Sequence, residues 1–275
     1  MDSTIEELKA RAKKVRIDII KMLSTAGSGH PGGALSSAEL MTALYFDQLR
    51  HNAKEPDWDE RDRVIFSKGH SCPLLYACLA ESGYFPKEEL FTLRQFGSRL
   101  QGHPGKDKGL PGLEASTGSL GQGLSIGVGM ALAARLSKKD FRVYVLVGDG
   151  ECDCGQIWEA AMSAGHYKLD NLCVILDYNG LQIDGTTEKV MGLEPLVKKW
   201  QDFRWRTIEI DGHNFKEILD AYQKAKDNRG TPAVIIAHTV KGKGVSFMEN
   251  KAEWHGDVPN REETKIALKE LEENG

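Results

Sequence analysis

Two polar residues in the middle of the chain have types and positions that suit the binding of a metal ion and a phosphate. Asp149 lies between Gly148 and Gly150 directly after one apolar run, and Asn179 follows the next apolar run. Carboxylate and amide oxygens are ligands that Mg²⁺ or Ca²⁺ prefers, and neighbouring glycines let a phosphate approach the backbone. The residues therefore indicate a cation–phosphate site; an Asp-Gly turn and an Asn-Gly turn without a ligand are the alternative interpretation.

The segments around these two residues predict how they come together. Arg142–Val147 and Leu172–Leu176 are rich in β-branched residues, as buried strands are. Gln156–Leu169, between them, has apolar residues at helical spacing. In a βαβ unit the strands are parallel and the crossover is right-handed, so both strands end at the same edge of the sheet. We therefore expect Asp149 and Asn179 to meet where open α/β sheets bind ligands.

Histidines in glycine-flanked loops are the second group of residues that could do chemistry. His30, His70, His103 and His255 each lie in such a loop. An imidazole can donate, accept or carry a proton near neutral pH, and site residues are often on loops. Each one alone could be a turn histidine bonded to backbone, but together with the Asp–Asn pair they favour a shared site. The other histidines are interpreted as structural: His51, His166, His213 and His238.

The rest of the chain alternates between strand-like and helix-like segments. Further strands are expected over Arg63–Ser67, Trp205–Ile210 and Ala233–His238. Helices are expected over Ser3–Ser24, from Ser36 or Ser37 to about Leu49, over Pro73–Ser82 and in a short segment from Pro86. Further helices are expected from the segment Ser116–Gly123 to about Leu136, over Leu193–Phe203, over 215–228 and from Asn260 onward. The glycine-dense segment 27–33 is expected to be a sharp loop. This alternation predicts an α/β fold: a doubly wound, mainly parallel sheet with helices on both faces.

Composition excludes several classes of protein. The chain has 275 residues, 40% of them hydrophobic and 28% charged, which is a globular composition. A net charge of −4 gives no electrostatic footprint for nucleic acid, and no apolar run is long enough to span a membrane. Five cysteines do not make a disulfide framework, and the N-terminus lacks the apolar core of a signal peptide. We therefore expect a cytoplasmic protein with reduced thiols, without a nucleic-acid or membrane partner.

A series of short motifs then follows along nearly the whole chain. They are GSGHPGG at 27–33, SKGH at 67–70, GHPG at 102–105, STGSLGQGLS at 116–125, GDGE at 148–151, WEA at 158–160, LDYNGLQIDG at 176–185 and HG at 255–256. In this order they make the chain resemble the N-terminal, diphosphate-binding half of a transketolase, a thiamine-diphosphate enzyme. The related deoxyxylulose-phosphate synthases share the GDG and Asn pattern, but the SKGH and STGSLGQG blocks are more similar to transketolase.

The resemblance implies a role for each motif residue. Residues 1–275 would form a single thiamine-diphosphate-binding domain, called the PP domain in this family. The residues implied as cofactor-binding are His70, Gly118, Ser119, Leu120, Gly148, Asp149, Gly150, Glu151, Asn179 and His255. Asp149 and Asn179 through their side chains, and Leu181 through its carbonyl, would hold Mg²⁺ or Ca²⁺ against the diphosphate. His30, His103 and His255 would be catalytic, relaying protons while a two-carbon ketol unit passes from a ketose phosphate to an aldose phosphate.

The resemblance also implies a missing half. Full-length members of the family continue into a pyrimidine-binding domain and a C-terminal domain, whereas this chain ends at Gly275 after a charged helix that we interpret as a natural end. We therefore expect a split transketolase of the pentose phosphate pathway, whose C-terminal subunit is a separate chain, in an α2β2 heterotetramer. Two alternatives stay open: a subunit of another thiamine-diphosphate sugar ketolase or synthase, and a non-catalytic module that binds the cofactor.

One position departs from the family pattern. The family usually has Gln-Glu where this chain has Asp153-Cys154. In the family that glutamate reaches the partner domain and links two active sites by a proton path. Because a thiol cannot share a proton in the same way, we expect altered cofactor affinity or altered coupling between sites.

Overall fold

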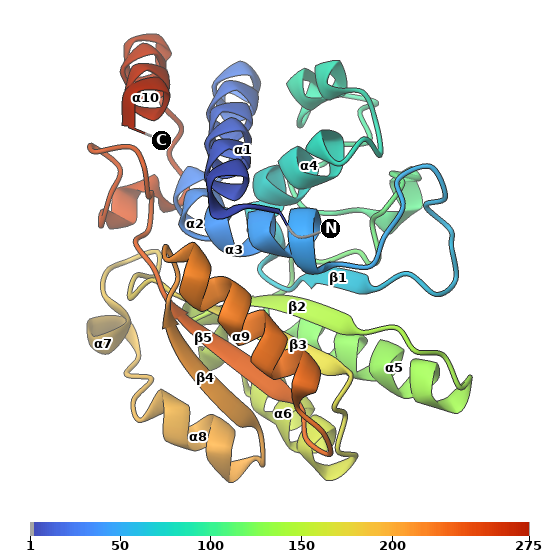
Figure 1. Ribbon diagram of the computed structural model, residues 1–275. Coiled ribbons are helices and arrows are strands. Elements are labelled where there is room, and N and C mark those ends of the chain that lie inside the picture. The colour runs from blue at the N-terminus through green and yellow to red at the C-terminus, as the bar shows by residue number, and fades with distance from the viewer. Residues whose placement is uncertain (1–2, 275) are drawn as a thin grey trace.

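A five-stranded sheet organises the fold in the computed structural model, which describes residues 3–274 (Figure 1). The strands run parallel in the spatial order β1-β2-β3-β5-β4. Their bounds are β1 Arg63–Phe66, β2 Val143–Gly148, β3 Leu172–Tyr178, β4 Arg206–Asp211 and β5 Ala233–His238. The predicted parallel, doubly wound sheet is thus confirmed, and each expected strand is present within one or two residues of its predicted bounds.

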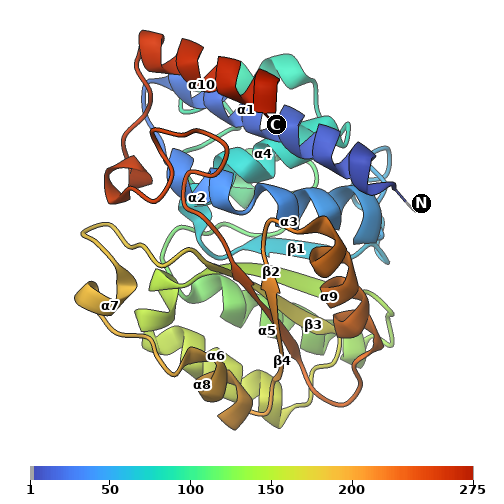
Figure 2. The same ribbon diagram turned by 60° about the vertical axis from the view of Figure 1, so that its left-hand side comes forward.

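Helices cover both faces of the sheet, as predicted (Figures 1 and 2). One face packs against α2 Pro31–Ser36, α3 Ala38–Ala43, α4 Cys72–Glu81 and α9 Phe215–Asp227. The other packs against α5 Gln122–Leu136, α6 Gly155–His166 and α8 Leu196–Asp202. The long helices α1 Ile5–Ala26 and α10 Arg261–Asn274 lie side by side outside the first layer, and a short α7 spans Thr187–Val190.

The central strands explain why two apolar cores form. Every residue of β2 is buried, because helices cover both of its faces. Side chains alternate across a strand, so Tyr144 and Leu146 enter the core on the α9 side, while Val145 and Val147 enter the core on the α5 and α6 side. The continuous apolar run in the sequence is therefore the signature of a buried parallel strand.

Strand register brings the predicted site residues level with one another. β2 and β3 pair so that Gly148 lies opposite Asp177. The ladder continues past β2, because the amide of Asp149 donates to the carbonyl of Asp177 over 3.2 Å. Asp149 and Asn179 therefore leave adjacent strands at the same edge of the sheet, as the βαβ argument predicts.

Polar caps start three of the helices. Thr4 accepts from the amide of Glu7, whose side chain accepts in return from the amide of Thr4, which makes a capping box at the start of α1. Asn214 accepts from the amide of Glu217 at the start of α9, and Asn260 accepts from the amide of Glu263 at the start of α10, as the sequence pairs Asn214–Glu217 and Asn260–Glu263 predict. These caps fix where the surface helices begin and therefore which face each one buries.

The segment 27–33 is the clearest correction to the sequence-based prediction. It is not a loop throughout, because α2 begins at Pro31 and includes Gly32 and Gly33. Proline suits the first position of a helix, and the glycines leave room for close neighbours. A Cβ on Gly32 would lie 2.8 Å from the carbonyl oxygen of Trp254 and 3.0 Å from the side chain of Lys241. Glycine is therefore present here for close packing.

The neighbouring helix prediction is also wrong in detail. A single helix from Ser36 or Ser37 to about Leu49 is replaced by α2, α3 and a π-helical turn over Leu44–Gln48. Neither serine caps a helix with its side chain. Their hydroxyls instead face the sheet, where Ser36 donates to Asp177 over 2.6 Å and Ser37 accepts from Lys68 over 2.8 Å. Tertiary hydrogen bonds have replaced the local capping role.

Smaller differences concern helix bounds. The helix expected over Leu193–Phe203 is shorter, and the segment after Pro86 is a 3₁₀ helix over Lys87–Thr92. The predicted chain end at Gly275 lies outside the described residues. Within the part that the structure describes, no helix is both long and apolar enough to cross a membrane.

Candidate functional site

A cavity of about 270 Å³ lies at the carboxyl ends of the strands, between the loops that follow β1, β2, β3 and β5. It is lined by nearly all of the residues predicted for the site: His30, His70, His103, Gly118, Leu120, Gly148, Asp149, Gly150, Glu151, Asn179, Leu181 and His255. Ser119 is the predicted cofactor residue that does not line it; this side chain is exposed. Segments that are far apart in the sequence thus meet at the edge where the βαβ unit places Asp149.

Asp149 is held by backbone amides at the start of a 3₁₀ turn over Gly150–Asp153. Its Oδ1 accepts from the amide of Gly150 over 2.8 Å, and its Oδ2 accepts from the amide of Gly180 over 2.6 Å. Burial, together with the negative charge of Asp177, raises the pKa of Asp149 to about 7. A bound cation would remove this penalty, because it would offset the buried negative charge.

A buried ion pair beneath the cavity fixes the orientation of Asn179. Asp177 accepts from Lys68, Ser36, Thr239 and the amide nitrogen of Asn179, and both charged members of the Lys68–Asp177 pair are almost fully buried. Burial alone would raise the pKa of Asp177, but the charge of Lys68 lowers it to about 2. Because Nδ2 of Asn179 is committed to Asp177, its Oδ1 lies on the side of Leu181, from whose amide it accepts over 3.1 Å.

The four loop histidines come together in one cluster. The ring of His30 lies 5.3 Å from that of His70, 6.1 Å from that of His103 and 5.5 Å from that of His255, between ring centroids. The rings of His70 and His255 are 5.0 Å apart. The four histidines that the sequence suggests for one site thus line the same cavity, and their shared chemical role stays a prediction. Each comes from a different loop, so only the tertiary fold brings them together.

Burial keeps this histidine cluster neutral. Desolvation, then the charge of Arg94, lowers the pKa of His30 to about 4. Desolvation, then the charge of Lys241, lowers the pKa of His255 to about 4. The pKa of His70 is held well below its usual value of 6.5 by burial and by the charge of Lys68. At neutral pH these imidazoles can therefore each donate one proton and accept another.

His255 contacts a lysine that its sequence context does not mark as a site residue. Nζ of Lys241 lies 3.1 Å from Nδ1 of His255 and 3.5 Å from the carbonyl oxygen of Leu181. An ammonium is only a donor, so Nδ1 of His255 accepts and its Nε2 carries the proton. Lys241 is 2% exposed, and burial lowers its pKa to about 8. This near-complete burial of a lysine facing a cavity marks it as a site residue.

Glu151 braces the loops around the cavity. One of its carboxylate oxygens accepts from the amide of Gly121 over 2.7 Å and from the hydroxyl of Ser67, and the other accepts from the amide of Gly148 over 3.2 Å. These bonds join the start of α5, the end of β1 and the end of β2. Its predicted contact with the cofactor stays a prediction.

The residues present fit a divalent cation and a diphosphate. Asp149, the amide oxygen of Asn179 and the carbonyl of Leu181 are oxygen donors on one side of the cavity, the set that Mg²⁺ and Ca²⁺ prefer. Across residues 3–274, no group of three or more His, Cys, Asp or Glu side chains is arranged to hold a metal, as a soft-metal site would require. Nδ1 of His30, a residue that lines the cavity, is buried without a hydrogen-bond partner among the described residues, which leaves a polar atom unused in this state.

Arg94 is a second residue near the site that sequence reasoning missed. It lies in a left-handed backbone conformation, with φ of 60°, which is strained for a residue with a side chain. Its guanidinium donates to Ser28 over 3.4 Å, and an outer cleft of about 430 Å³ that it shares with Gly102 and His103 adjoins the candidate site at His103. The sequence offers one weak signal, the glycine at 102: a Cβ there would lie 2.7 Å from the guanidinium of Arg94.

Cys154, the position that departs from the family pattern, caps the start of α6 and does not line the cavity. Its side chain is half-buried, and burial together with the charge of Glu151 raises the pKa of the thiol. The neighbouring Asp153 is exposed and accepts from Gln182 over 2.8 Å, which keeps its carboxylate away from the thiol position.

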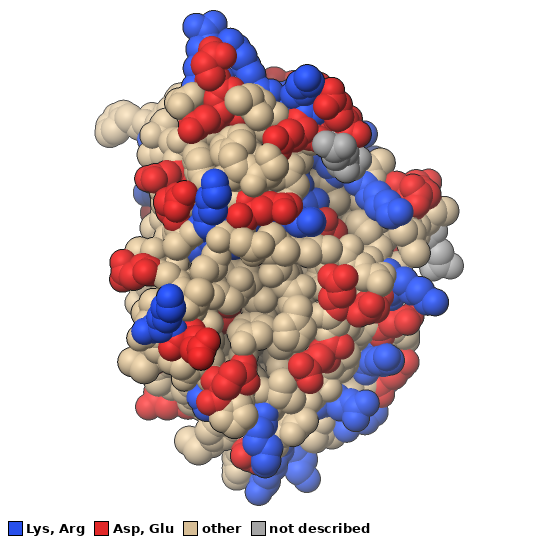
Figure 3. Space-filling view, turned by 90° about the vertical axis from the view of Figure 1, so that its left-hand side faces the viewer, with Lys and Arg blue, Asp and Glu red and all other residues tan. Residues whose placement is uncertain are grey.

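The face toward which the loops after β3 and β5 project is largely uncharged around its centre (Figure 3). A hollow lies there, and most Lys, Arg, Asp and Glu side chains on this face lie around it. Several apolar side chains near the cavity are exposed, among them Leu120, Ile183, Val190 and Met191. An uncharged surface with exposed apolar side chains around a site suits contact with another protein surface.

Comparison with known proteins agrees with this geometry. Residues 8–273 match the family model described as transketolase, thiamine diphosphate binding domain. The chain is 44% identical to an apulose-4-phosphate transketolase subunit of Phocaeicola vulgatus, over 98% of this chain and 95% of that protein. It is 45% identical to a 6-deoxy-6-sulfo-D-fructose transketolase subunit of Clostridium sp., over 98% of each chain.

Longer proteins match the chain over part of their length. Mouse transketolase is 41% identical over 92% of this chain but over 40% of its own length. The crystal structure of Campylobacter jejuni transketolase superposes with a TM-score of 0.93 at 35% identity, covering 98% of this chain and 43% of that one. The chain therefore spans about two fifths of a full transketolase and nearly the whole of the relatives that are described as subunits.

Proposed function

Because the chain belongs to the transketolase family of thiamine-diphosphate-binding domains, we propose that it is the diphosphate-binding subunit of a two-chain ketol transferase. The observation that carries the proposal is the meeting of Asp149, Asn179 and Leu181 with the histidine cluster in one cavity. One end of this cavity suits a cation and a diphosphate, and the other suits proton transfer.

The metal end is formed by oxygen atoms of this chain. Asp149 and Asn179 through their side chains, and Leu181 through its carbonyl, would hold Mg²⁺, which would offset the negative charge of the diphosphate. The amides of Gly150 and Gly180 keep the Asp149 carboxylate in place. Lys241, within reach of Leu181 and His255, offers a positive charge to the diphosphate. His70, Gly118 and Leu120 line the space in which the cofactor lies.

Thiamine diphosphate, when bound, supplies the carbanion chemistry by which a two-carbon ketol unit is taken from a ketose and given to an aldose. The task of this chain is then to hold substrates and move protons. His30, His103 and His255 would face the reacting carbons. His30, as a neutral imidazole, can accept a proton at one ring nitrogen and donate from the other, whereas His255, whose Nδ1 accepts from Lys241, donates from Nε2. His30 and His255 are partly buried and His103 is exposed, so a partner subunit covering the cavity would be needed to keep bulk water from competing for these protons.

A separate C-terminal subunit completes the site in this proposal. The chain covers about 43% of a full transketolase chain, and two of its relatives are described as transketolase subunits. The uncharged face around the cavity would accommodate such a partner, in an α2β2 assembly. The partner would carry the pyrimidine-binding half and most contacts to the sugar phosphate.

The substrates are sugar phosphates or sugars with a similar anionic end. The two named relatives act, by their names, on apulose 4-phosphate and on 6-deoxy-6-sulfo-D-fructose, so related subunits differ in their sugar. Classical transketolase activity with xylulose 5-phosphate and ribose 5-phosphate, a reaction of the pentose phosphate pathway, is the first activity to test. A subunit of another thiamine-diphosphate sugar ketolase is the second candidate, supported by the same two relatives.

One experiment tests the proposal. The chain is mixed with a C-terminal transketolase subunit from the same genome, Mg²⁺ and thiamine diphosphate, and ketol transfer is assayed with a panel of ketose donors. Activity that needs both chains and the cofactor supports the proposal. Normal turnover by this chain alone would overturn the two-chain part, and absence of cofactor binding with and without the partner would favour a module with another function.

A further inference from the structure

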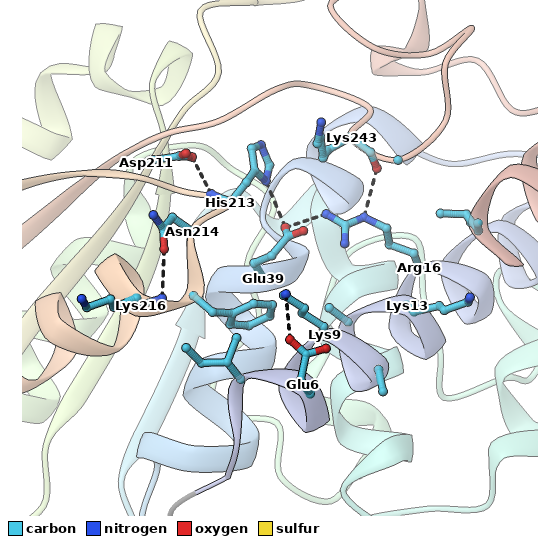
Figure 4. A pocket seen from close by; sticks show the side chains of 16 residues that line it. Glu6, Lys9, Lys13, Arg16, Glu39, Asp211, His213, Asn214, Lys216 and Lys243 are labelled. Atoms are coloured by element: carbon cyan, nitrogen blue, oxygen red, sulfur yellow. Dashed lines mark hydrogen bonds and ion pairs between the residues drawn. The ribbon is translucent and has the colours of Figure 1, made fainter. Parts of the chain in front are cut away.

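A second cavity, of about 890 Å³, opens beside the candidate site between α1, α3, the start of α9 and the loop after β5 (Figure 4). Three polar side chains meet in it: Arg16 from α1, Glu39 from α3 and His213 from the turn after β4. We call these three residues the Arg16–Glu39–His213 network. In the sequence His213 is indistinguishable from an ordinary turn histidine, and neither of the other two belongs to a recognisable motif.

The network is buried and internally bonded. Oε2 of Glu39 accepts from Nη2 of Arg16 over 2.5 Å and lies 3.1 Å from Nδ1 of His213. Arg16 is 6% exposed and Glu39 is 8% exposed. Charged side chains so far from solvent are retained where their specific partners matter, since an apolar core would otherwise be as stable.

The free ends of the network hold the loop after β5. Nε2 of His213 accepts from the amide of Val240 over 2.9 Å, and Nε of Arg16 donates to the carbonyl of Lys243 over 3.0 Å. A backbone amide can only donate, so Nε2 of His213 is unprotonated and Nδ1 carries the proton toward Glu39. One neutral tautomer of His213 therefore satisfies both contacts.

Lys241 lies between these two anchor points and faces the other cavity. Its ammonium reaches His255 and the carbonyl of Leu181, while the adjacent amide of Gly242 donates to the carbonyl of Gly32 over 3.0 Å. The loop thus has one side toward the candidate cofactor site and the other toward the network. Fixing the backbone at 240 and 243 limits where the Cα of Lys241 can lie, and hence where a flexible lysine side chain can end.

We propose that Arg16, Glu39 and His213 are positioning residues for Lys241. They hold its ammonium where it can contact the diphosphate, and they do not contact the ligand themselves. This rests on the proposed function, because it assumes that the diphosphate occupies the cavity of Asp149. The packing of Gly244 supports the same role: a Cβ there would lie 3.1 Å from Cδ of Arg16, so glycine lets the loop close over the arginine.

The experiment measures binding of pyrophosphate with Mg²⁺ to the full chain by calorimetry. His213→Phe removes the acceptor for Val240, and we expect about a tenfold loss of affinity. His213→Gln keeps an amide acceptor and donor and should stay within about threefold of the parent. The control is His51→Phe, a half-buried histidine that bonds Tyr45 and Tyr84 away from the cavity and should leave the affinity unchanged.

A second variant guards against failure of His213→Phe to fold. Arg16→Lys keeps a positive charge beside Glu39 but cannot supply the same Nε donor to Lys243, and it should also weaken pyrophosphate binding. Each substitution is repeated in a Lys241→Ala background, where a network that acts through Lys241 has no further effect on affinity.

The outcomes separate this inference from the proposed function. An equal loss of affinity in both backgrounds, or no loss from either substitution, overturns the positioning role and leaves the proposed function intact. A parent chain that binds no pyrophosphate, both alone and with the C-terminal subunit, overturns both.

Discussion

The ammonium of Lys68 and the carboxylate of Asp177 form an ion pair that is almost fully excluded from solvent, directly beneath the cavity. The pair is held by further bonds from Ser36, Ser37 and Thr239, so the buried charges keep polar partners. Asp177 in turn orients Asn179. The pair therefore links the stability of the sheet to the shape of the candidate metal site.

Breaking this pair from one side should be costly. Lys68→Met leaves the Asp177 carboxylate buried without its counter-charge, and we expect a loss of about 3–5 kcal/mol in the free energy of unfolding. Denaturant titration followed by circular dichroism measures it. Lys198→Met, which removes the lysine of the exposed Lys198–Asp202 pair, is the control and should change stability little. Similar small losses in both variants would show that the buried pair contributes no more than a surface pair.

Substitution can distinguish the role of Asp149, the candidate metal ligand, from that of the nearby carboxylate of Asp153. Asp149→Asn should weaken Mg²⁺-dependent pyrophosphate binding by about 100-fold or more, because even outer-shell partners of metal ligands are worth about 10–100-fold. Asp153→Asn changes an exposed carboxylate in the same turn and should stay within about twofold. Calorimetry at fixed Mg²⁺ compares the two variants; equal effects would place the cation elsewhere.

Acid should expose the contribution of Glu39 to stability. Burial alone would raise the pKa of Glu39, but the charge of Arg16 and the bond from His213 lower it from 4.5 to about 2. A carboxyl whose pKa is lower in the folded state than in the unfolded state stabilises the fold at any pH above its unfolded-state pKa. This stabilisation is lost as the pH falls from about 4.5 to about 2. Over this whole pH range, the free energy of unfolding should fall by roughly 3 kcal/mol.

Glu39→Gln tests that linkage. Stability of the parent should fall across this acidic window, and the variant should show a flatter dependence on pH there, whatever its stability at pH 7. Urea titrations at a series of pH values give the two slopes. Parallel slopes would mean that Glu39 does not titrate with a lowered pKa.

The histidine cluster should remain neutral in mildly acidic solution. The pKa values of His30 and His255 are lowered to about 4, so the ¹⁵N shifts of their rings should keep the pattern of a neutral imidazole between pH 8 and pH 5.5, even where nearby groups titrate. Removal of a nearby charge by Arg94→Ala should raise the pKa of His30, since Arg94 opposes its protonation. Titration of His30 near 6.5 in the parent would contradict the buried, unprotonated cluster.

Cys154, where the family usually has a glutamate, is the position at which the effect of this difference can be tested. Restoring the family residue by Cys154→Glu should change thiamine-diphosphate affinity or the cooperativity of its binding once the partner subunit is present. Cys154→Ser, which keeps the size but not the thiol, is the matched control and should resemble the parent. Superimposable cofactor titrations of all three proteins would remove any functional meaning from the departure.

Local pattern is enough to predict the sheet and the residues at its edge. Buried strands such as β2 and β3 show as apolar runs, and parallel pairing then places Asp149 beside the segment of Asn179. The histidines are also recognisable, because glycine-flanked loops concentrate site residues. Their shared cavity is confirmed by ring separations of 5.0 to 6.1 Å.

Sequence patterns do not identify residues whose roles depend on tertiary contacts. Lys241 and Arg94 look like surface charges in the sequence, and only burial or an unusual backbone angle marks them. Ser36 and Ser37 suit capping roles because local rules favour serine there, but contacts with Asp177 and Lys68 replace those roles. The sequence indicates only a structural role for His213, because both of its partners are distant in sequence. Glu39 lies in α3, and Val240 lies in the loop after β5.

The two helical glycines of α2 are poor positions at which to stabilise this protein by engineering. Exchanging a helical glycine for alanine is normally one of the easiest ways to raise a melting temperature, because it reduces the entropy of the unfolded chain. At Gly32 the added methyl would strike the carbonyl of Trp254, and at Gly33 it would project toward His70 in the cavity. Glycine-to-alanine substitution is better tried at the exposed Gly129 of α5, where an added Cβ would meet nothing within 4 Å.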